Sequence, residues 1–120
     1  MVATLINWRE HVLTVAIGAS ETGEIDLEGQ PIVMIYTPAA VEATTAQLGL
    51  KAGRVAGTRE FVQDVFGTRS VMPFTCPRPI EVPIDRHSSL RFVSFVLETA
   101  AGVAVVQTAV RTFVVVTRPV

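Results

Sequence analysis

The sequence contains few of the residues that build disulfides or metal sites. Cys76 is the only cysteine among 120 residues, which excludes a disulfide within the chain and every metal site made of several cysteines. The two histidines, His11 and His87, form neither a His-x-His nor a His-x-x-x-His pair. A metal site of the kind found in small β-barrel enzymes needs such a pair. We therefore expect neither a metal nor another cofactor.

The sequence also lacks the residue patterns typical of catalysis. The eight glycines are scattered singly, so no glycine-rich phosphate loop is present and turns explain them. Asp85-Arg86-His87-Ser88-Ser89 holds the residue types of a hydrolytic triad. A triad, however, needs side chains that converge from separate elements, so we interpret this segment as a polar turn. For Cys76, a buried structural role is the commoner case. The chain is predicted not to be an enzyme.

Charge gives little indication of a partner. The formal net charge is -1, which provides no electrostatic reason to expect nucleic acid or a membrane. Lys51 is the one basic residue that is not arginine. Arginine suits protein interfaces and fixed ion pairs, although codon usage in a GC-rich genome explains the bias equally well. Residues 1–9 become charged too early for a signal peptide, and Glu98 and Arg111 interrupt the longest uncharged stretch. We expect a soluble protein that is retained inside a cell.

The pattern of short apolar runs predicts an all-β fold. Valine occurs 20 times, and β-branched residues fit a pleated, half-buried surface. Turn residues break the chain at short intervals, as in an antiparallel β-sandwich. Residues 37–43 are compatible with one short helical turn. We expect an N-terminal arm at residues 1–10 and a single domain at 11–120. The predicted strands are residues 11–17, 21–27, 32–36, 44–51, 59–66, 80–84, 91–98 and 103–117, the last long enough for two strands.

Two of the predicted strands are apolar on both faces. Residues 21–27 alternate between polar and apolar side chains, which indicates one face in water. By contrast, residues 91–98 and 109–116 are largely apolar on both sides. A two-sheet sandwich has one interior, so these strands need a second cover. That cover is either another subunit or partner surface, which we favour, or a loop or the N-terminal arm of the same chain.

The chain contains a series of short motifs. They are Ala16-Ile17-Gly18-Ala19-Ser20, Gly23-Glu24-Ile25-Asp26-Leu27-Glu28-Gly29, the strand ending in Pro38-Ala39-Ala40, Ala46-Gln47-Leu48-Gly49-Leu50-Lys51-Ala52, and Gln107 followed by Arg111-Thr112. Their order resembles that of small virion proteins of tailed bacteriophages and gene transfer agents. The resemblance spans most of residues 12–118 and implies a jelly-roll-like β-sandwich attached to a capsid shell or tail. It implies no activity. In such proteins the strand at Arg91–Phe95 is usually followed by Ser-Gly or Thr-Gly, whereas here the apolar run continues through Val96-Leu97-Glu98.

We therefore expect a structural virion protein, assembled in the host cytoplasm. Its simplest role is that of a capsid decoration or cement protein that self-associates and binds the major capsid protein. A lone buried charge is costly, so the arginine of the apolar C-terminal strand is expected to pair with a carboxylate. The N-terminal tryptophan either closes the core or anchors the arm on a neighbour. The candidate interface residues are Trp8, Arg9, Arg86, His87, Arg111 and Phe113.

The alternative is a recognition module of a head fibre or tail appendage that binds host-surface carbohydrate. Glu60, Asp64 and Asp85 would supply carboxylates on exposed loops. The small number of large amphipathic aromatic residues, Trp8 and Tyr36, counts against this alternative.

Overall fold

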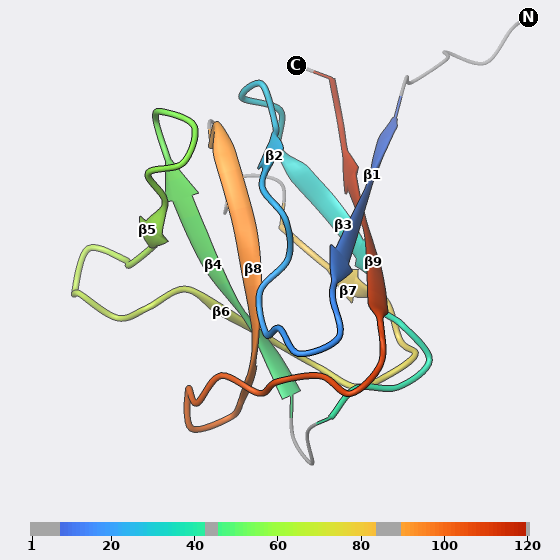
Figure 1. Cartoon of the computed structure of the whole chain (residues 1–120). Helices are drawn as coiled ribbons and strands as arrows, with labels where there is room; N and C mark the ends of the chain where they lie inside the picture. Colours follow the sequence, from blue (N-terminus) through green and yellow to red (C-terminus); the bar gives the residue numbers. More distant parts are fainter. Residues whose placement is uncertain (1–7, 43–45, 84–89, 120) are drawn as a thin grey trace, which may run out of the picture.

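The chain folds into two antiparallel β-sheets. A computed structural model describes residues 8–42, 46–83 and 90–119, and within these ranges every regular element is a strand. The first sheet has the order β1-β9-β3-β7, and the second has the order β2-β8-β4-β5 with β6 beside β4 (Figure 1). No helix in these ranges is long and apolar enough to cross a membrane. The strands are β1 (Arg9–Val15), β2 (Ile25–Asp26), β3 (Ile32–Tyr36), β4 (Ala46–Gly53), β5 (Glu60–Phe61), β6 (Val71–Phe74), β7 (Ile80–Glu81), β8 (Phe92–Thr99) and β9 (Arg111–Thr117).

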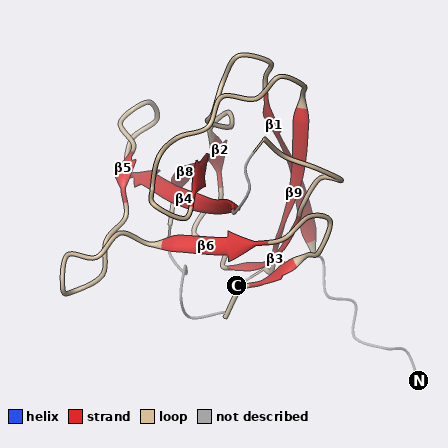
Figure 2. Ribbon diagram, turned by 90° about the horizontal axis from the view of Figure 1, so that it is seen from below, coloured by secondary structure: helices blue, strands red, loops and turns tan. Residues whose placement is uncertain are grey.

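Both sheets contribute to one hydrophobic core. Figure 2 shows β1, β3 and β9 on one side of the molecule and β4 and β8 on the other. Phe74 of β6 meets Phe113 of β9 edge to face, with ring centroids 5.9 Å apart, a favourable aromatic geometry. The most deeply buried core residues are Leu13, Val15, Ile32, Ile35, Phe113 and Val115 of the first sheet and Leu48, Leu50, Val93, Phe95 and Leu97 of the second.

The all-β prediction is confirmed, but several predicted boundaries were wrong. The strand predicted at residues 32–36 forms as β3. β1 begins at Arg9, two residues earlier than predicted, so residues 9 and 10 belong to a strand and not to an arm. Residues 1–7 of the predicted arm lie outside the described residues. β6 was missed because Pro73 interrupts its short apolar run, and proline is unfavourable in central strands.

Other predicted strands are shorter than expected. Of residues 21–27 only β2 is a strand, with one isolated bridge from Glu21 to Val96. Of residues 59–66 only β5 is a strand, since Asp64 begins a tight turn. The run at 103–117 becomes a strand only from Arg111. The predicted helical turn does not form at residues 37–42, and residue 43 lies outside the described residues.

The second cover of β8 comes from the same chain. Ser94, Val96 and Glu98 face away from the core, yet all three are buried. Side chains of Arg59 and Arg69 reach over this face and bond to Ser94 and Glu98. For β8 the expected intermolecular cover was therefore wrong, because polar side chains of neighbouring loops already supply one.

Candidate binding surface

The outer face of the first sheet carries a band of apolar side chains. Alternation along a strand sends every second residue away from the core. Val12 of β1 lies opposite Val114 of β9, which lies opposite Tyr36 of β3. Val116 of β9 lies similarly opposite Met34 of β3. Val12 is 67% exposed and Tyr36 is 49% exposed.

A bulge in β3 adds one more apolar residue to this face. The register with β9 shifts between Ile32 and Met34. The extra residue changes the alternation, so the neighbours Val33 and Met34 line the same hollow. The backbone oxygen of Val33 accepts a hydrogen bond from the amide of Val82, at 3.1 Å, which holds the bulge beside β7.

The hollow has a volume of about 410 Å³ and lies between β1 and β3. Trp8 lies at its rim and is 49% exposed, so this side chain is on the surface and does not close the core. Glu10 and Glu81 stand at the two ends of the row that contains Val116 and Met34. An apolar centre with a polar rim is the usual organisation of a protein interface. We call Trp8, Val12, Val33, Met34, Tyr36, Val114 and Val116 the outer face.

A second exposed apolar feature lies at the tip of the hairpin between β5 and β6. Val65 is 92% exposed and Phe66 is 89% exposed. The carboxylate of Asp64 accepts hydrogen bonds from the amides of Phe66 and Thr68, at 2.8 and 3.0 Å. Gly67 has a φ of 83°, which glycine adopts without strain. These bonds hold the two apolar side chains in water. The strand predicted at residues 59–66 includes Val65 and Phe66, so this exposed tip was not predicted.

The predicted interface residues have different positions in the structure. Arg9 is exposed and forms an ion pair with Glu28. Arg111 bonds to Glu42 at 3.2 Å and to Gln107 at 3.1 Å, so the predicted carboxylate partner is present. Phe113 is 1% exposed in the core between the sheets. Its side chain offers no surface to a partner, and we correct its assignment to the core. Arg86 and His87 lie outside the described residues.

Glu98 is the most deeply buried charged residue of the described chain. Its carboxylate is 1% exposed and accepts a hydrogen bond from Gln47 Nε2 at 2.7 Å. Arg69 Nη2 lies 2.8 Å from each carboxylate oxygen. The guanidinium also stacks on Phe61, 3.8 Å from the ring centroid. Burial of a charge is tolerated when such partners neutralise it, so this cluster has a structural role.

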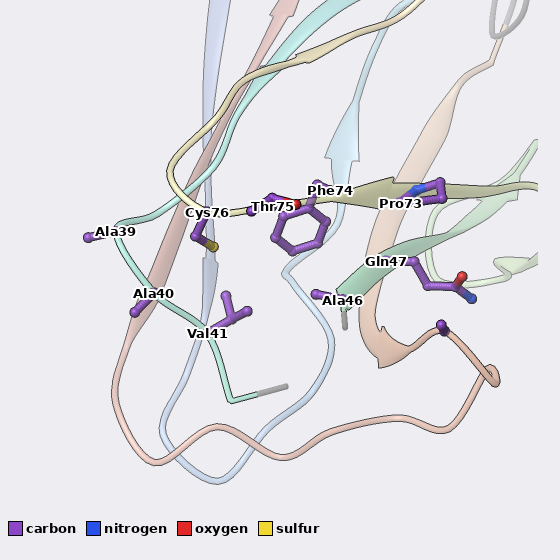
Figure 3. Close-up of a pocket in the computed structure, with 10 residues that line it drawn as sticks. Ala39, Ala40, Val41, Ala46, Gln47, Pro73, Phe74, Thr75 and Cys76 are labelled. Atoms are coloured by element: carbon purple, nitrogen blue, oxygen red, sulfur yellow. The ribbon is translucent and has the colours of Figure 1, made fainter. Parts of the chain in front are cut away.

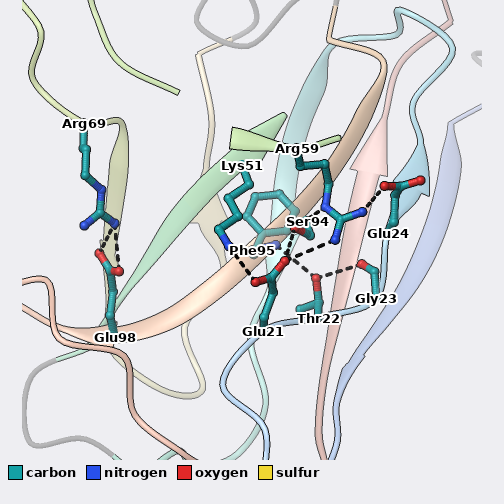
Figure 4. A network of polar contacts seen from close by, with 10 residues as sticks. All are labelled: Glu21, Thr22, Gly23, Glu24, Lys51, Arg59, Arg69, Ser94, Phe95 and Glu98. Atoms are coloured by element: carbon teal, nitrogen blue, oxygen red, sulfur yellow. Dashed lines mark hydrogen bonds and ion pairs between the residues drawn. The ribbon is translucent and has the colours of Figure 1, made fainter. Parts of the chain in front are cut away.

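A second polar cluster surrounds Glu21 on the same side of the second sheet. Lys51 Nζ lies 2.9 Å from its carboxylate and Ser94 Oγ lies 2.8 Å away (Figure 4). Arg59 links this group to Glu24. Burial alone would raise the pKa of Glu21, but the bonds from Lys51, Ser94 and Arg59 together hold the pKa below its usual range. Each of these carboxylates has a cation of the same chain beside it, which indicates that this cluster also has a structural role.

A hollow of about 610 Å³ opens beside the turn that contains Cys76. Figure 3 shows Val41, Phe74 and Cys76 directed into the space between their segments. Burial raises the pKa of the Cys76 thiol, which makes it less reactive than a free cysteine. Gln47 also lines the hollow, but its amide already donates to Glu98. This hollow contains no converging set of unpaired polar groups among the described residues.

The described residues include no group of three or more His, Cys, Asp or Glu side chains that could hold a metal ion. Comparison with known proteins finds no family model, no curated protein and no solved structure that matches this chain. The outer face is therefore the candidate site on the strength of its own geometry.

Proposed function

We propose that this chain is a structural virion protein, a capsid decoration or cement protein that self-associates and binds the major capsid protein. The observation that carries the proposal is the outer face, where Trp8, Val12 and Tyr36 remain exposed together on one sheet. Contiguous exposed apolar surface on a small protein marks an interaction site. Tryptophan and tyrosine are also the residues most often found at interface hot spots.

The order of the strands supports a jelly-roll-like β-sandwich as the fold within this proposal. β1, β3, β7 and β9 belong to one sheet, while β2, β4 and β8 belong to the other. The chain thus crosses repeatedly from one sheet to the other, as it does in jelly rolls. Viral capsid domains use that architecture, as do lectins and cupins, so the fold alone does not separate these functions.

The rim of the outer face defines the partner surface that would fit. Glu10 and Glu81 place carboxylates on either side of the apolar row. A capsid surface with an apolar projection flanked by arginine or lysine would complement both parts. Charges at the rim of an interface mainly affect the association rate and its dependence on salt.

Co-sedimentation with assembled capsid shells of the same virus tests the proposal. Trp8→Ala and Tyr36→Ala each remove a large exposed side chain, and each is expected to weaken shell binding by about tenfold or more. Arg54→Ala, at an exposed position of the β4–β5 loop, is the matched control and should bind as the wild type does. A wild-type chain that never binds shells, and is absent from purified particles, would overturn the proposal.

The same hollow favours one second candidate, a module that binds host-surface carbohydrate. Trp8 and Tyr36 present two aromatic rings beside the carboxylate of Glu10, the combination that stacks on and hydrogen-bonds to a sugar. A glycan array with the wild-type chain and Glu10→Gln tests this. Binding that depends on Glu10, together with no affinity for shells, would favour the carbohydrate module.

A further inference from the structure

The first sheet ends in one long unpaired edge. β1 contains seven residues and pairs along its whole length with β9. No described segment pairs with the other side of β1, so alternate residues present their backbone amide and carbonyl groups there to solvent. A sheet edge of this kind is a template on which another strand can add.

The other described edges are protected against such pairing. β2, β5 and β7 each contain two residues, which is too short to support a new ladder. Pro73 interrupts β6, and Pro79 and Pro83 flank β7. Natural proteins commonly use short edge strands and proline to prevent edge-to-edge association.

β1 has none of these protective features. Its sequence from Arg9 to Val15 contains no proline, glycine or lysine. Its register with β9 runs without a bulge over all seven residues. Among the described edges only β1 lacks this protection, so a general tendency of the protein to aggregate does not explain its exposed edge.

We infer that β1 pairs antiparallel with β1 of a second copy of this chain, about a two-fold axis perpendicular to the sheet. The inference rests on the proposed function in so far as that function includes self-association, and it identifies the strand responsible. Two-fold dimers are the commonest closed assemblies, and they use the same surface on both subunits.

The sequence of β1 favours one register. A perpendicular two-fold axis keeps the outer faces of both sheets on the same side, so residues with the same orientation must lie opposite each other. With Val12 opposite Val12 of the second copy, Glu10 lies opposite Thr14 and Arg9 lies opposite Val15. This register buries Val12, the most exposed apolar residue of the strand, and places no like charges directly opposite each other.

Pairing in this register would join two four-stranded sheets into one continuous sheet. The outer faces of the two copies would then lie side by side and form one apolar surface of twice the width. A single strand pair buries less area than a standard interface of about 1,600 Å², so we expect a dissociation constant of micromolar order.

Introducing a charge at Val12, the residue on the two-fold axis, tests the inference. Val12 is exposed, so Val12→Lys and Val12→Glu should both fold, and each should be monomeric because like charges then face each other. An equimolar mixture of the two variants should regain the dimer. Thr112→Lys is the matched control: it adds the same charge on β9, whose two neighbours in the sheet are β1 and β3, and should stay dimeric. Sedimentation velocity over a concentration series gives the stoichiometry.

A cysteine scan tests the register. In a Cys76→Ser background, Val12→Cys should form an intermolecular disulfide, because residues directly opposite in an antiparallel pair have Cα atoms about 4.5–5.5 Å apart, a separation that a disulfide spans. Thr14→Cys should not, since its own counterpart would lie about 14 Å away along the strand. Efficient cross-linking of Thr14→Cys but not Val12→Cys would overturn this register.

Failure of the inference is distinguishable from failure of the proposed function. A wild-type chain that binds shells but stays monomeric at its highest soluble concentration overturns the β1 pairing and the proposed self-association, but leaves the binding to the capsid in place. A dimer that Val12→Lys leaves intact also overturns it. A chain that dimerises through Val12 but does not bind shells supports the pairing and contradicts the capsid role.

Discussion

Arg69 covers the buried carboxylate of Glu98 with a single guanidinium nitrogen, which lies 2.8 Å from both carboxylate oxygens. Glu98 belongs to β8, and Arg69 follows the hairpin tip, 29 residues earlier in the chain. The pair therefore fastens the protruding hairpin to the outer side of the second sheet. The pair also explains how β8, whose sequence is largely apolar on both faces, is covered within one chain.

Loss of Arg69 should strongly destabilise the fold. Arg69→Met leaves Glu98 charged and buried without its cation, and we expect about 3 kcal/mol less free energy of unfolding. Urea unfolding of the wild type and the variant measures the difference. Arg54→Met changes an exposed arginine and should shift the free energy of unfolding by no more than about 0.5 kcal/mol. Equal losses in both variants would show that the ion pair is not the cause.

A side chain at Gly49 should disturb the ion pair between Arg69 and Glu98. A Cβ atom there would lie 2.7 Å from Arg69 Nη2 and 3.1 Å from Glu98 Oε2. Gly49→Ala is therefore expected to displace the ion pair and to cost about 1–3 kcal/mol. At Gly23 a Cβ atom meets nothing within 4 Å, so Gly23→Ala is the matched control and should not destabilise the fold. Thermal unfolding of both variants measures the effect, and identical unfolding temperatures would contradict this account.

Glu21 should make the protein less stable in acid. The pKa of Glu21 lies below its ordinary value of 4.5, because the bonds from Lys51, Ser94 and Arg59 outweigh the effect of burial. Its ionised form thus contributes stability above pH 4.5, and that contribution is lost as the pH falls through the lowered pKa. Glu21→Gln should have a smaller loss of stability between neutral and acidic pH. An unchanged pH dependence of unfolding would contradict the role of this cluster.

His11 should add a second acid-sensitive step. Burial, and then the charge of Arg9, lower its pKa from 6.5, while Glu28 acts in the opposite direction. The folded state favours the neutral ring, so stability is complete above pH 6.5 and declines as the pH falls below that value. His11→Asn should remove this decline, while Glu21→Gln should leave it in place. Chemical unfolding at closely spaced pH values separates the two steps.

The two phenylalanines Phe113 and Phe66 should behave in opposite ways. Phe113→Ala opens a cavity in the core and is expected to cost about 3–5 kcal/mol. Phe66→Ala removes a side chain that is 89% exposed and should change stability by less than about 0.5 kcal/mol. Phe66→Ala should nevertheless weaken binding to shells if the hairpin tip contacts the capsid. A large loss of stability in Phe66→Ala would mean that this side chain packs against the fold.

The strand content was predictable because alternation and turn residues act locally. The run at residues 32–36 satisfies both signals and forms β3. The bulge at Val33 was not predictable, since it depends on the pairing of β3 with β9, which lies more than 75 residues away. The hairpin tip was mistaken for a strand because Val65 and Phe66 have strand-forming side chains. Their conformation is decided instead by the hydrogen bonds that the Asp64 carboxylate accepts from the amides of Phe66 and Thr68, and by Gly67.

The candidate site was predictable only in part. Trp8 was a candidate from its residue type, and it lies at the rim of the hollow. Phe113 was also a candidate but lies in the core, because the alternation of β9 shows which residues share a face and not which face is inside. Tyr36 and Met34 join the surface only through pairing with β9.

The sequence alone predicts an all-β protein in which two strands carry more apolar surface than one core requires. Composition and alternation are properties of neighbouring residues, so they can be read without knowledge of the partners. The tertiary structure shows that loops of the same chain cover β8, whereas Val12 and Tyr36, on either side of β9, remain exposed. This difference between the two strands depends on contacts between residues far apart in the chain, such as Arg69 with Glu98 and Met34 with Val116.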